Sequence, residues 1–184
     1  MVLNPQTRYL IVNADDLGMH ASYDAAIFDA HERGIITSAS MAATGVSFAA
    51  AAERARRTWT LGLGVHLVLH DERPVSDPSQ VRSLVGPDGR FWPLHTQLRR
   101  ILLGRVRKDE VAREWQAQID KVRQEGLQPD HIDGHCHLSS FPALGPLAHR
   151  LARNAGIRCA RASEATRWRE FRGTPLGRWP VSLF

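Results

Sequence analysis

The stretch Leu10-Ile11-Val12-Asn13-Ala14-Asp15-Asp16-Leu17-Gly18 joins an apolar β-type run to two adjacent carboxylates. The run predicts a strand over 9–13, followed by a loop that carries Asp15 and Asp16. Neighbouring side chains point to opposite faces within a strand, but just past its end both can turn toward one cleft. There, one carboxylate could ligate a metal ion while the other takes a proton from water. A solvated turn, or Asp16 as the N-cap of a following helix, is the alternative.

Two later apolar runs also end in polar residues. His66 follows the run 61–65, where a hydrogen-bonded core histidine is the alternative to a ligand. His131, Asp133, His135 and His137 alternate, so a strand would place all four on one face. Crowding four titratable groups is unfavourable unless they are hydrogen-bonded, ionised together or gathered around a cation. Imidazole and carboxylate ligands together predict a divalent-metal site with a position open to water.

Strand-like and helix-like segments alternate along the chain, which predicts an α/β fold with a parallel sheet. The expected strands cover 9–13, 35–42, 61–69, a run after Pro129, and 157–160. Four helices are expected: one that carries Tyr23, Ala26, Ile27 and Ala30, one over 48–57, one from Lys108 to before Gly126, and one that carries Leu144, Leu147, Leu151 and Ala155. The third of these helices has Val111, Trp115, Ile119 and Val122 on one face. Sites in such folds lie at the carboxyl ends of the strands. The polar segment 70–95 either covers a site or is a tolerated, mobile insertion.

Composition predicts one domain over 1–184, because 184 residues with 43% apolar content can bury one sizeable core. We expect no signal peptide and no transmembrane segment, hence a cytoplasmic protein. The net charge of +5 comes mainly from dispersed arginines, so we expect no specific nucleic-acid partner. The two cysteines, Cys136 and Cys159, are too few for a disulfide framework, and we expect both to serve packing.

Five blocks of the sequence resemble, in order, those of the YdjC-like carbohydrate deacetylases, a family that includes chitooligosaccharide deacetylase and the hopanoid-associated deacetylases. The blocks are Asn13-Ala14-Asp15-Asp16-Leu17-Gly18, Gly34-Ile35-Ile36-Thr37-Ser38, Gly64-Val65-His66-Leu67-Val68-Leu69, Pro129-Asp130-His131-Ile132-Asp133-Gly134-His135-Cys136-His137, and Gly156-Ile157-Arg158-Cys159-Ala160-Arg161. The resemblance implies a distorted (β/α) barrel and a hydrolase that removes N-acetyl groups from an amino sugar. An acetylated amino sugar, as an oligosaccharide or a glycolipid, would be the substrate.

The resemblance also implies roles for individual residues. Asp16, His66 and His135 would bind one divalent metal ion, and Asp15 would be the general base. Arg161 would lie near the substrate or orient a carboxylate. The resemblance suggests magnesium, whereas imidazole ligands favour zinc on chemical grounds. His137 is a candidate general acid, with a role in orienting His135 as the alternative.

The chain departs from the family pattern at three places. Gly134 stands where serine is usual, and Ser139 stands where many members have histidine. The chain ends at Phe184, so we expect an open barrel without its last strand-helix units and with an irregular tail over 162–184. Unpaired sheet edges would favour association, including a homo-oligomer. A non-catalytic module that binds metal or sugar, and a metal-dependent phosphoesterase, are the alternative functions.

Overall fold

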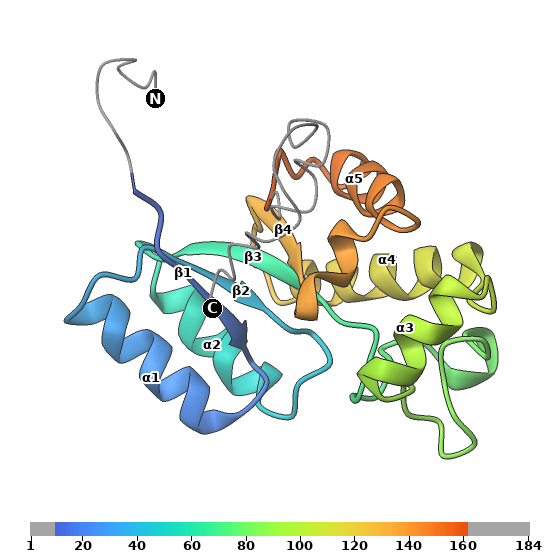
Figure 1. The fold of residues 1–184 in the computed structure, drawn as a ribbon. Helices are drawn as coiled ribbons and strands as arrows, with labels where there is room; N and C mark the ends of the chain where they lie inside the picture. The colour runs from blue at the N-terminus through green and yellow to red at the C-terminus, as the bar shows by residue number, and fades with distance from the viewer. Residues whose placement is uncertain (1–9, 162–184) are drawn as a thin grey trace, which may run out of the picture.

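The computed structural model describes residues 10–161, which form one five-stranded parallel sheet with helices between its strands (Figure 1). The strands are β1 (Asn13–Leu17), β2 (Ser38–Met41), β3 (Gly62–Leu67), β4 (His131–Gly134) and β5 (Cys159–Ala160), hydrogen-bonded in the order of the sequence. This arrangement confirms the predicted α/β class and the parallel sheet. The tail over 162–184 and Tyr9 lie outside the described residues.

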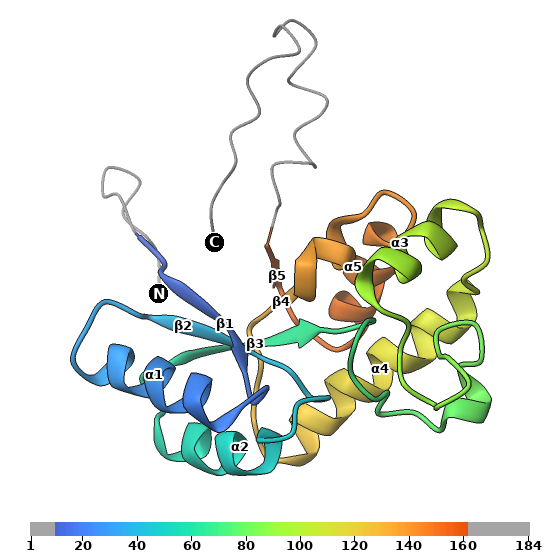
Figure 2. The same ribbon diagram turned by 60° about the horizontal axis from the view of Figure 1, so that its bottom comes forward.

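Five α-helices connect and flank the strands. They are α1 (Ala21–Glu32), α2 (Phe48–Arg57), α3 (Leu94–Leu102), α4 (Lys108–Gln124) and α5 (Gly145–Asn154), with two short 3-10 helices, η1 (Pro78–Gln80) and η2 (His135–Ser140). Because parallel crossovers are right-handed, a sheet whose strands follow in sequence order carries its helices on one face, and Figure 2 shows α1 and α2 side by side along the β1–β2 part of the sheet. Within residues 10–161, every helix is too short or too polar to cross a bilayer.

The sheet curls so strongly that its two edge strands approach each other. Arg161 follows β5 directly, and its guanidinium donates two hydrogen bonds of 2.6 Å to Asp15 on β1. In a flat sheet the first and fifth strands would lie about 19 Å apart, beyond the combined reach of these side chains. The curvature is that of a partial barrel, and it brings the carboxyl ends of all five strands together.

Helix α4 supplies the best-predicted part of the core. Val111, Trp115, Ile119 and Val122 are all fully buried, as their helical spacing predicts. Helix α1 differs from its prediction, because Tyr23 is 54% exposed and the buried positions are Asp24, Ile27 and Phe28. The Asp24 carboxylate accepts a 2.6 Å hydrogen bond from the Gly18 amide, and this contact turns a polar residue of α1 toward the sheet.

The first strand begins later than predicted. Its pairing with β2 starts at Asn13, which lies opposite Ser38, and Leu10 and Ile11 before it are 80% and 75% exposed. Before Asn13, the Val12 carbonyl accepts from the amides of Thr37 and Ser38, and the Val12 amide donates to Thr37 Oγ1. The two aspartates therefore lie inside β1 and not in a loop after it.

The segment 70–95 is held against α4 by buried carboxylates. Glu114 accepts hydrogen bonds of 2.9 Å from the amides of Val75 and Ser76, and Glu110 accepts one of 2.6 Å from the Ser83 amide. The segment also places apolar side chains in the core: Val81, Leu84 and Phe91 are at most 3% exposed. Residues 70–95 are therefore anchored, in contrast to the mobile insertion that their polar composition allowed.

Candidate metal centre and active site

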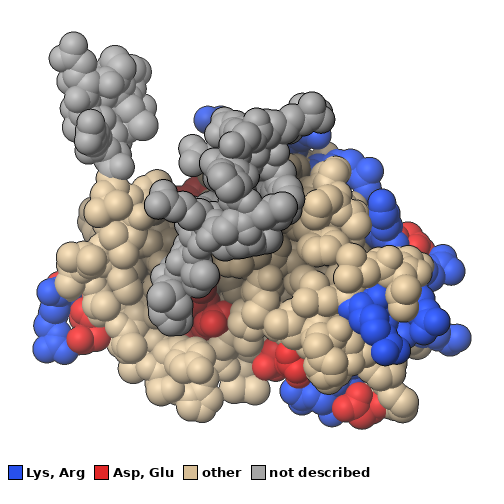
Figure 3. All heavy atoms as spheres, viewed as in Figure 1, with Lys and Arg blue, Asp and Glu red and all other residues tan. Residues whose placement is uncertain are grey.

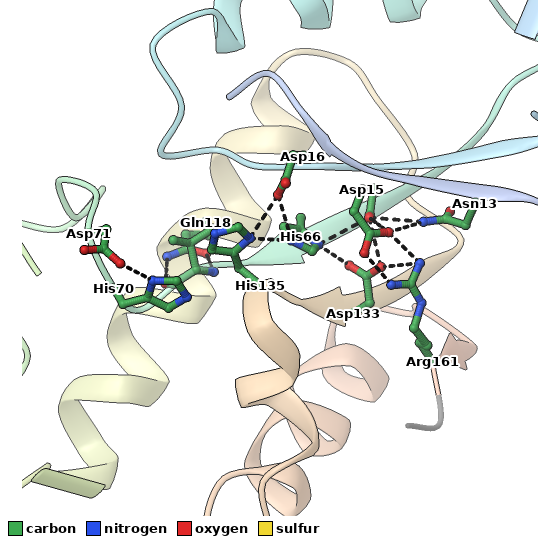
Figure 4. Close-up of polar contacts among 12 residues, drawn as sticks. Asn13, Asp15, Asp16, His66, His70, Asp71, Gln118, Asp133, His135 and Arg161 are labelled. Carbon is green, nitrogen blue, oxygen red and sulfur yellow. Dashed lines mark hydrogen bonds and ion pairs between the residues drawn. The ribbon is translucent and has the colours of Figure 1, made fainter. Parts of the chain in front are cut away.

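Each of the five strands places a polar side chain at its carboxyl end, and these side chains form one network (Figure 4). The contributors are Asp15 and Asp16 from β1, Ser40 from β2, His66 from β3, Asp133 from β4, His135 directly after β4, and Arg161 directly after β5. His66 and Asp133 are register partners in the β3–β4 ladder, which explains why their side chains meet.

A bulge in β1 lets two adjacent aspartates reach the same site. The register of β1 against β2 shifts between Ala14 and Leu17, and Asp16 has a φ of 67°. This left-handed conformation is uncommon for residues other than glycine but is tolerated by aspartate. The two carboxylates therefore converge as predicted, and the cause is a bulge inside the strand. The N-cap of α1 is His20, which excludes that role for Asp16.

Three donor atoms form a compact triangle. Asp16 Oδ1 lies 3.1 Å from His66 Nε2 and 2.9 Å from His135 Nδ1, and the two ring nitrogens are 3.2 Å apart. Ligand atoms bound at about 2.0–2.2 Å to one ion are roughly 2.9–3.5 Å apart in octahedral or tetrahedral geometry. Asp16 Oδ1 is buried, and among the described residues it faces these two ring nitrogens without a hydrogen bond of regular geometry. The donor set and its spacing thus fit one divalent ion.

Asp133 fixes the orientation of His66. Its Oδ1 lies 2.7 Å from His66 Nδ1, and because an ionised carboxylate only accepts, Nδ1 carries the proton and Nε2 faces Asp16. Burial lowers the pKa of His66, but the Asp133 hydrogen bond and the nearby Asp16 carboxylate outweigh burial and raise that pKa to about 9. The metal-free ring therefore holds a second proton at the place where a cation would bind.

Asp15 is held ionised beside this triangle. Burial alone would raise the pKa of Asp15, but the hydrogen bonds and charge of Arg161 and the nearby His66 lower it overall. Asn13 adds a 2.8 Å hydrogen bond to Oδ1. One oxygen or ring nitrogen each from Asp15, His66 and Asp133 lies within 4.8 Å of the others. An ionised carboxylate is thus in place to accept a proton next to the donor triangle.

The predicted continuous strand over His131–His137 is wrong beyond Gly134. Cys136 and His137 adopt φ values of 49° and 59°, so the chain turns into η2 and the alternation of faces ends. A Cβ at Gly134 would lie 2.4 Å from Ser139 Oγ, so this tight turn needs glycine where the family pattern has serine. His135 still reaches the site, whereas His137 is exposed.

The cysteines also differ from expectation. Cys136 and Cys159 are both exposed, so the predicted packing role is wrong for each. Partial desolvation of its sulfur, with the charges of Asp16 and Asp71, raises the pKa of the Cys136 thiol. Cys136 therefore carries a protonated, accessible thiol next to His135.

One residue of the network, Ser40, and one beside it, His70, were not identified from the sequence. Ser40 donates a 2.9 Å hydrogen bond to Asp133 Oδ2 and lies 3.3 Å from His66 Nδ1, and only its place at a strand end could have marked it. His70 stacks on His135 with ring centroids 4.6 Å apart. Burial lowers the pKa of His70 more than its Asp71 hydrogen bond raises it, so the His70 ring is neutral.

Positive and negative side chains are distributed unevenly over the visible surface. In Figure 3, lysine and arginine side chains gather mostly over the α3–α5 side of the molecule, and carboxylates are visible beside β1 near the centre of the view. Within the network itself, Arg161 pairs with Asp15 and Asp133, whereas Asp16 faces His66 and His135. One divalent cation would balance the remaining negative charge.

Comparisons with known proteins identify a matching family and several similar sequences and structures. The sequence profile of the YdjC-like protein family matches residues 9–179. A carbohydrate deacetylase of Geobacillus stearothermophilus is 37% identical over 145 residues, covering 79% of this chain. A chitooligosaccharide deacetylase of Salmonella paratyphi B is 33% identical over 153 residues, covering 82% of this chain. A crystal structure from Enterococcus faecalis V583, described as having a suggested role in cellobiose-phosphate cleavage, superposes with a TM-score of 0.75 at 34% identity over 88% of this chain.

The chain spans a little over half the length of these relatives. It covers 56% of the Geobacillus stearothermophilus protein, 58% of the Salmonella protein and 62% of the Enterococcus faecalis structure. The matched part contains all five strands and every residue of the strand-end network.

Proposed function

This chain belongs to the YdjC-like protein family, and from that premise we propose that its strand-end network is the active site of a metal-dependent carbohydrate N-deacetylase. The observation that carries the proposal is the triangle of Asp16, His66 and His135, with donor atoms 2.9–3.2 Å apart. An ionised carboxylate, Asp15, lies directly beside it. A metal site with an adjacent proton acceptor provides one route to the hydrolysis of an unactivated amide.

Each residue of the site has a separate role in the proposed reaction. Asp16, His66 and His135 would hold one divalent ion, and when bound this ion polarises the acetamide carbonyl. Asp15 accepts a proton from the attacking water at a carboxylate oxygen. Arg161 keeps Asp15 ionised and oriented through two hydrogen bonds of 2.6 Å.

The substrate we propose is an acetylated amino sugar, because the relatives named above are carbohydrate and chitooligosaccharide deacetylases. Magnesium, as the family resemblance suggests, would be the working ion, with zinc as the chemical alternative. His137 as general acid stays a prediction, since its exposed side chain makes no hydrogen bond within residues 10–161. The cytoplasmic location and the homo-oligomer also stay predictions.

Binding of Mg²⁺ to the chelator-treated chain tests the metal part of the proposal. Calorimetry should give one equivalent in the wild type and in His149→Ala, a control on an exposed histidine of α5. His66→Ala and His135→Ala should each lose most of the binding. Full stoichiometry in both of these variants would refute the site.

Product analysis tests the reaction. Acetate release from N-acetylated chito-oligosaccharides, abolished by Asp15→Asn with Mg²⁺ binding intact, is the expected outcome. Phosphate release from sugar phosphates without acetate release would instead indicate the phosphoesterase alternative. Metal binding with neither product would indicate a non-catalytic binding module.

A further inference from the structure

A second group of metal-binding side chains lies next to the first. One donor atom each from His70, His135 and Cys136 lies within 4.8 Å of the others. Figure 4 shows His70 beside His135, on the side away from Asp15. His135 therefore belongs to two donor sets, one with Asp16 and His66 and one with His70 and Cys136.

His70 presents a buried and unsatisfied nitrogen. The residue is 2% exposed, and its Nδ1 lies 2.6 Å from Asp71 Oδ2. Because the carboxylate can only accept, Nδ1 carries the proton and Nε2 carries a free lone pair. Nε2 is buried and has no hydrogen-bond partner among residues 10–161. The pair Asp71–His70 repeats the pair Asp133–His66, in which a carboxylate orients a ligating imidazole.

The sulfur decides which cation fits. Thiolate and imidazole together select zinc-class ions, whereas magnesium prefers oxygen donors. Zinc binds sulfur at about 2.3 Å and nitrogen at about 2.0–2.1 Å, so its ligands lie roughly 3.3–3.8 Å apart. The observed limit of 4.8 Å leaves shifts of about 1 Å per side chain to close on one ion, and Cys136 lies at an exposed turn where such a shift is easy.

We propose that His70, His135 and Cys136 form a second cation site, specific for zinc-class ions over magnesium. Binding replaces the Cys136 S–H bond by a sulfur–metal bond, and the proton passes to solvent. When the triangle of Asp16, His66 and His135 is filled as well, His135 uses both ring nitrogens and its N–H proton also passes to solvent, so no oxidant is needed. Asp71 acts as a positioning residue through His70. The site shares His135 with the proposed catalytic centre but does not depend on any activity of that centre.

Cobalt substitution tests the sulfur ligand directly. The chelator-treated, reduced chain is titrated with Co²⁺, and the thiolate-to-cobalt charge-transfer band is recorded in the near ultraviolet. Wild type and Cys159→Ser, which removes the other exposed cysteine, should both show the band. Cys136→Ser should lack it and should bind one equivalent of Zn²⁺ fewer than the wild type. No band in the wild type, or an unchanged band in Cys136→Ser, would overturn the proposal.

Two further variants separate this site from the first. His66→Ala should lose Mg²⁺ binding and keep the charge-transfer band, so failure of one site can be told from failure of the other. Loss of an outer-shell partner lowers metal affinity about 10–100-fold, so Asp71→Asn should weaken Co²⁺ binding by that factor, and His70→Ala by at least about 100-fold. If His70→Ala does not fold, the Co²⁺ affinity of Asp71→Asn tests the role of His70. This variant should fold, because the Asp71 carboxylate is mostly exposed. Unchanged Co²⁺ affinity in Asp71→Asn and, where it folds, His70→Ala would remove His70 from the site.

Discussion

Replacing Asp133 by asparagine tests whether metal affinity depends on the group that orients His66. The Asp133 carboxylate accepts from His66 Nδ1 at 2.7 Å and from Ser40 Oγ at 2.9 Å, and it lies 3.0 Å from Arg161 Nη2. Asparagine has the same shape but offers one acceptor and one donor end. Whichever way the amide is oriented, its NH₂ group faces a donor: either His66, or Ser40 and Arg161.

The expected magnitude follows from this conflict. Loss of the partner that orients a ligating histidine lowers metal affinity about 10–100-fold, which corresponds to roughly 1.4–2.7 kcal/mol. The free energy of unfolding should fall by about 1–3 kcal/mol, because one buried donor loses its acceptor. Calorimetric titration of Mg²⁺ into the chelator-treated variant and urea unfolding measure these two quantities.

Asp130→Asn is the matched control for Asp133→Asn. Asp130 lies 2.5 Å from His131 Nδ1, but its side chain is 67% exposed and the pair is outside the donor triangle. Loss of the Asp130 carboxylate should leave the affinity for Mg²⁺ unchanged. Wild-type affinity in a folded Asp133→Asn variant, or an equal loss in both variants, would refute the reasoning.

Three other results are expected. Asp15→Asn should bind Mg²⁺ normally and slow acetate release about 10²–10⁴-fold, and a near-normal initial rate would show that Asp15 is not the base. Glu114→Ala leaves two amides of the segment 70–95 without acceptors, so urea unfolding should show a loss of about 2–5 kcal/mol. The control Glu53→Ala, at an exposed ion pair, should change the free energy of unfolding by less than about 0.5 kcal/mol. Equal losses in the two variants would show that Glu114 does not anchor the segment 70–95. Because His66 holds a second proton below about pH 9 in the metal-free chain, Mg²⁺ affinity should rise with pH up to that value, by up to about tenfold per unit; a flat affinity profile would contradict this.

Periodicity predicted the elements whose burial is apolar. Helix α4 follows its pattern because its apolar buried face consists of Val111, Trp115, Ile119 and Val122. A second buried stripe, of Glu110, Glu114 and Gln118, was missed because polar residues are usually exposed. Their spacing of four residues is the signal that could have identified the stripe, since it repeats once per helical turn.

Local backbone conformation explains most of what sequence reasoning missed in the site. Asp16, Cys136 and His137 have positive φ values, which are uncommon for residues other than glycine, so a strand was predicted where the chain bulges or turns. The strand-end position of the ligands was still predictable, because parallel strands bring their carboxyl ends to one edge. The hydrogen bonds of Ser40 depend on β-sheet register and curvature, which the sequence does not specify alone.

The contact between Asp15 and Arg161 has a consequence for the order in which the protein matures. The two residues are 146 positions apart, so their contact closes a long loop and is expected late in folding. The metal donors are complete once the chain has folded through His135, 26 residues before Arg161. During synthesis, which proceeds from the N-terminus, a nascent chain could therefore capture its metal ion before the proton acceptor is locked in place, and catalytic competence would follow metal loading as a separate step.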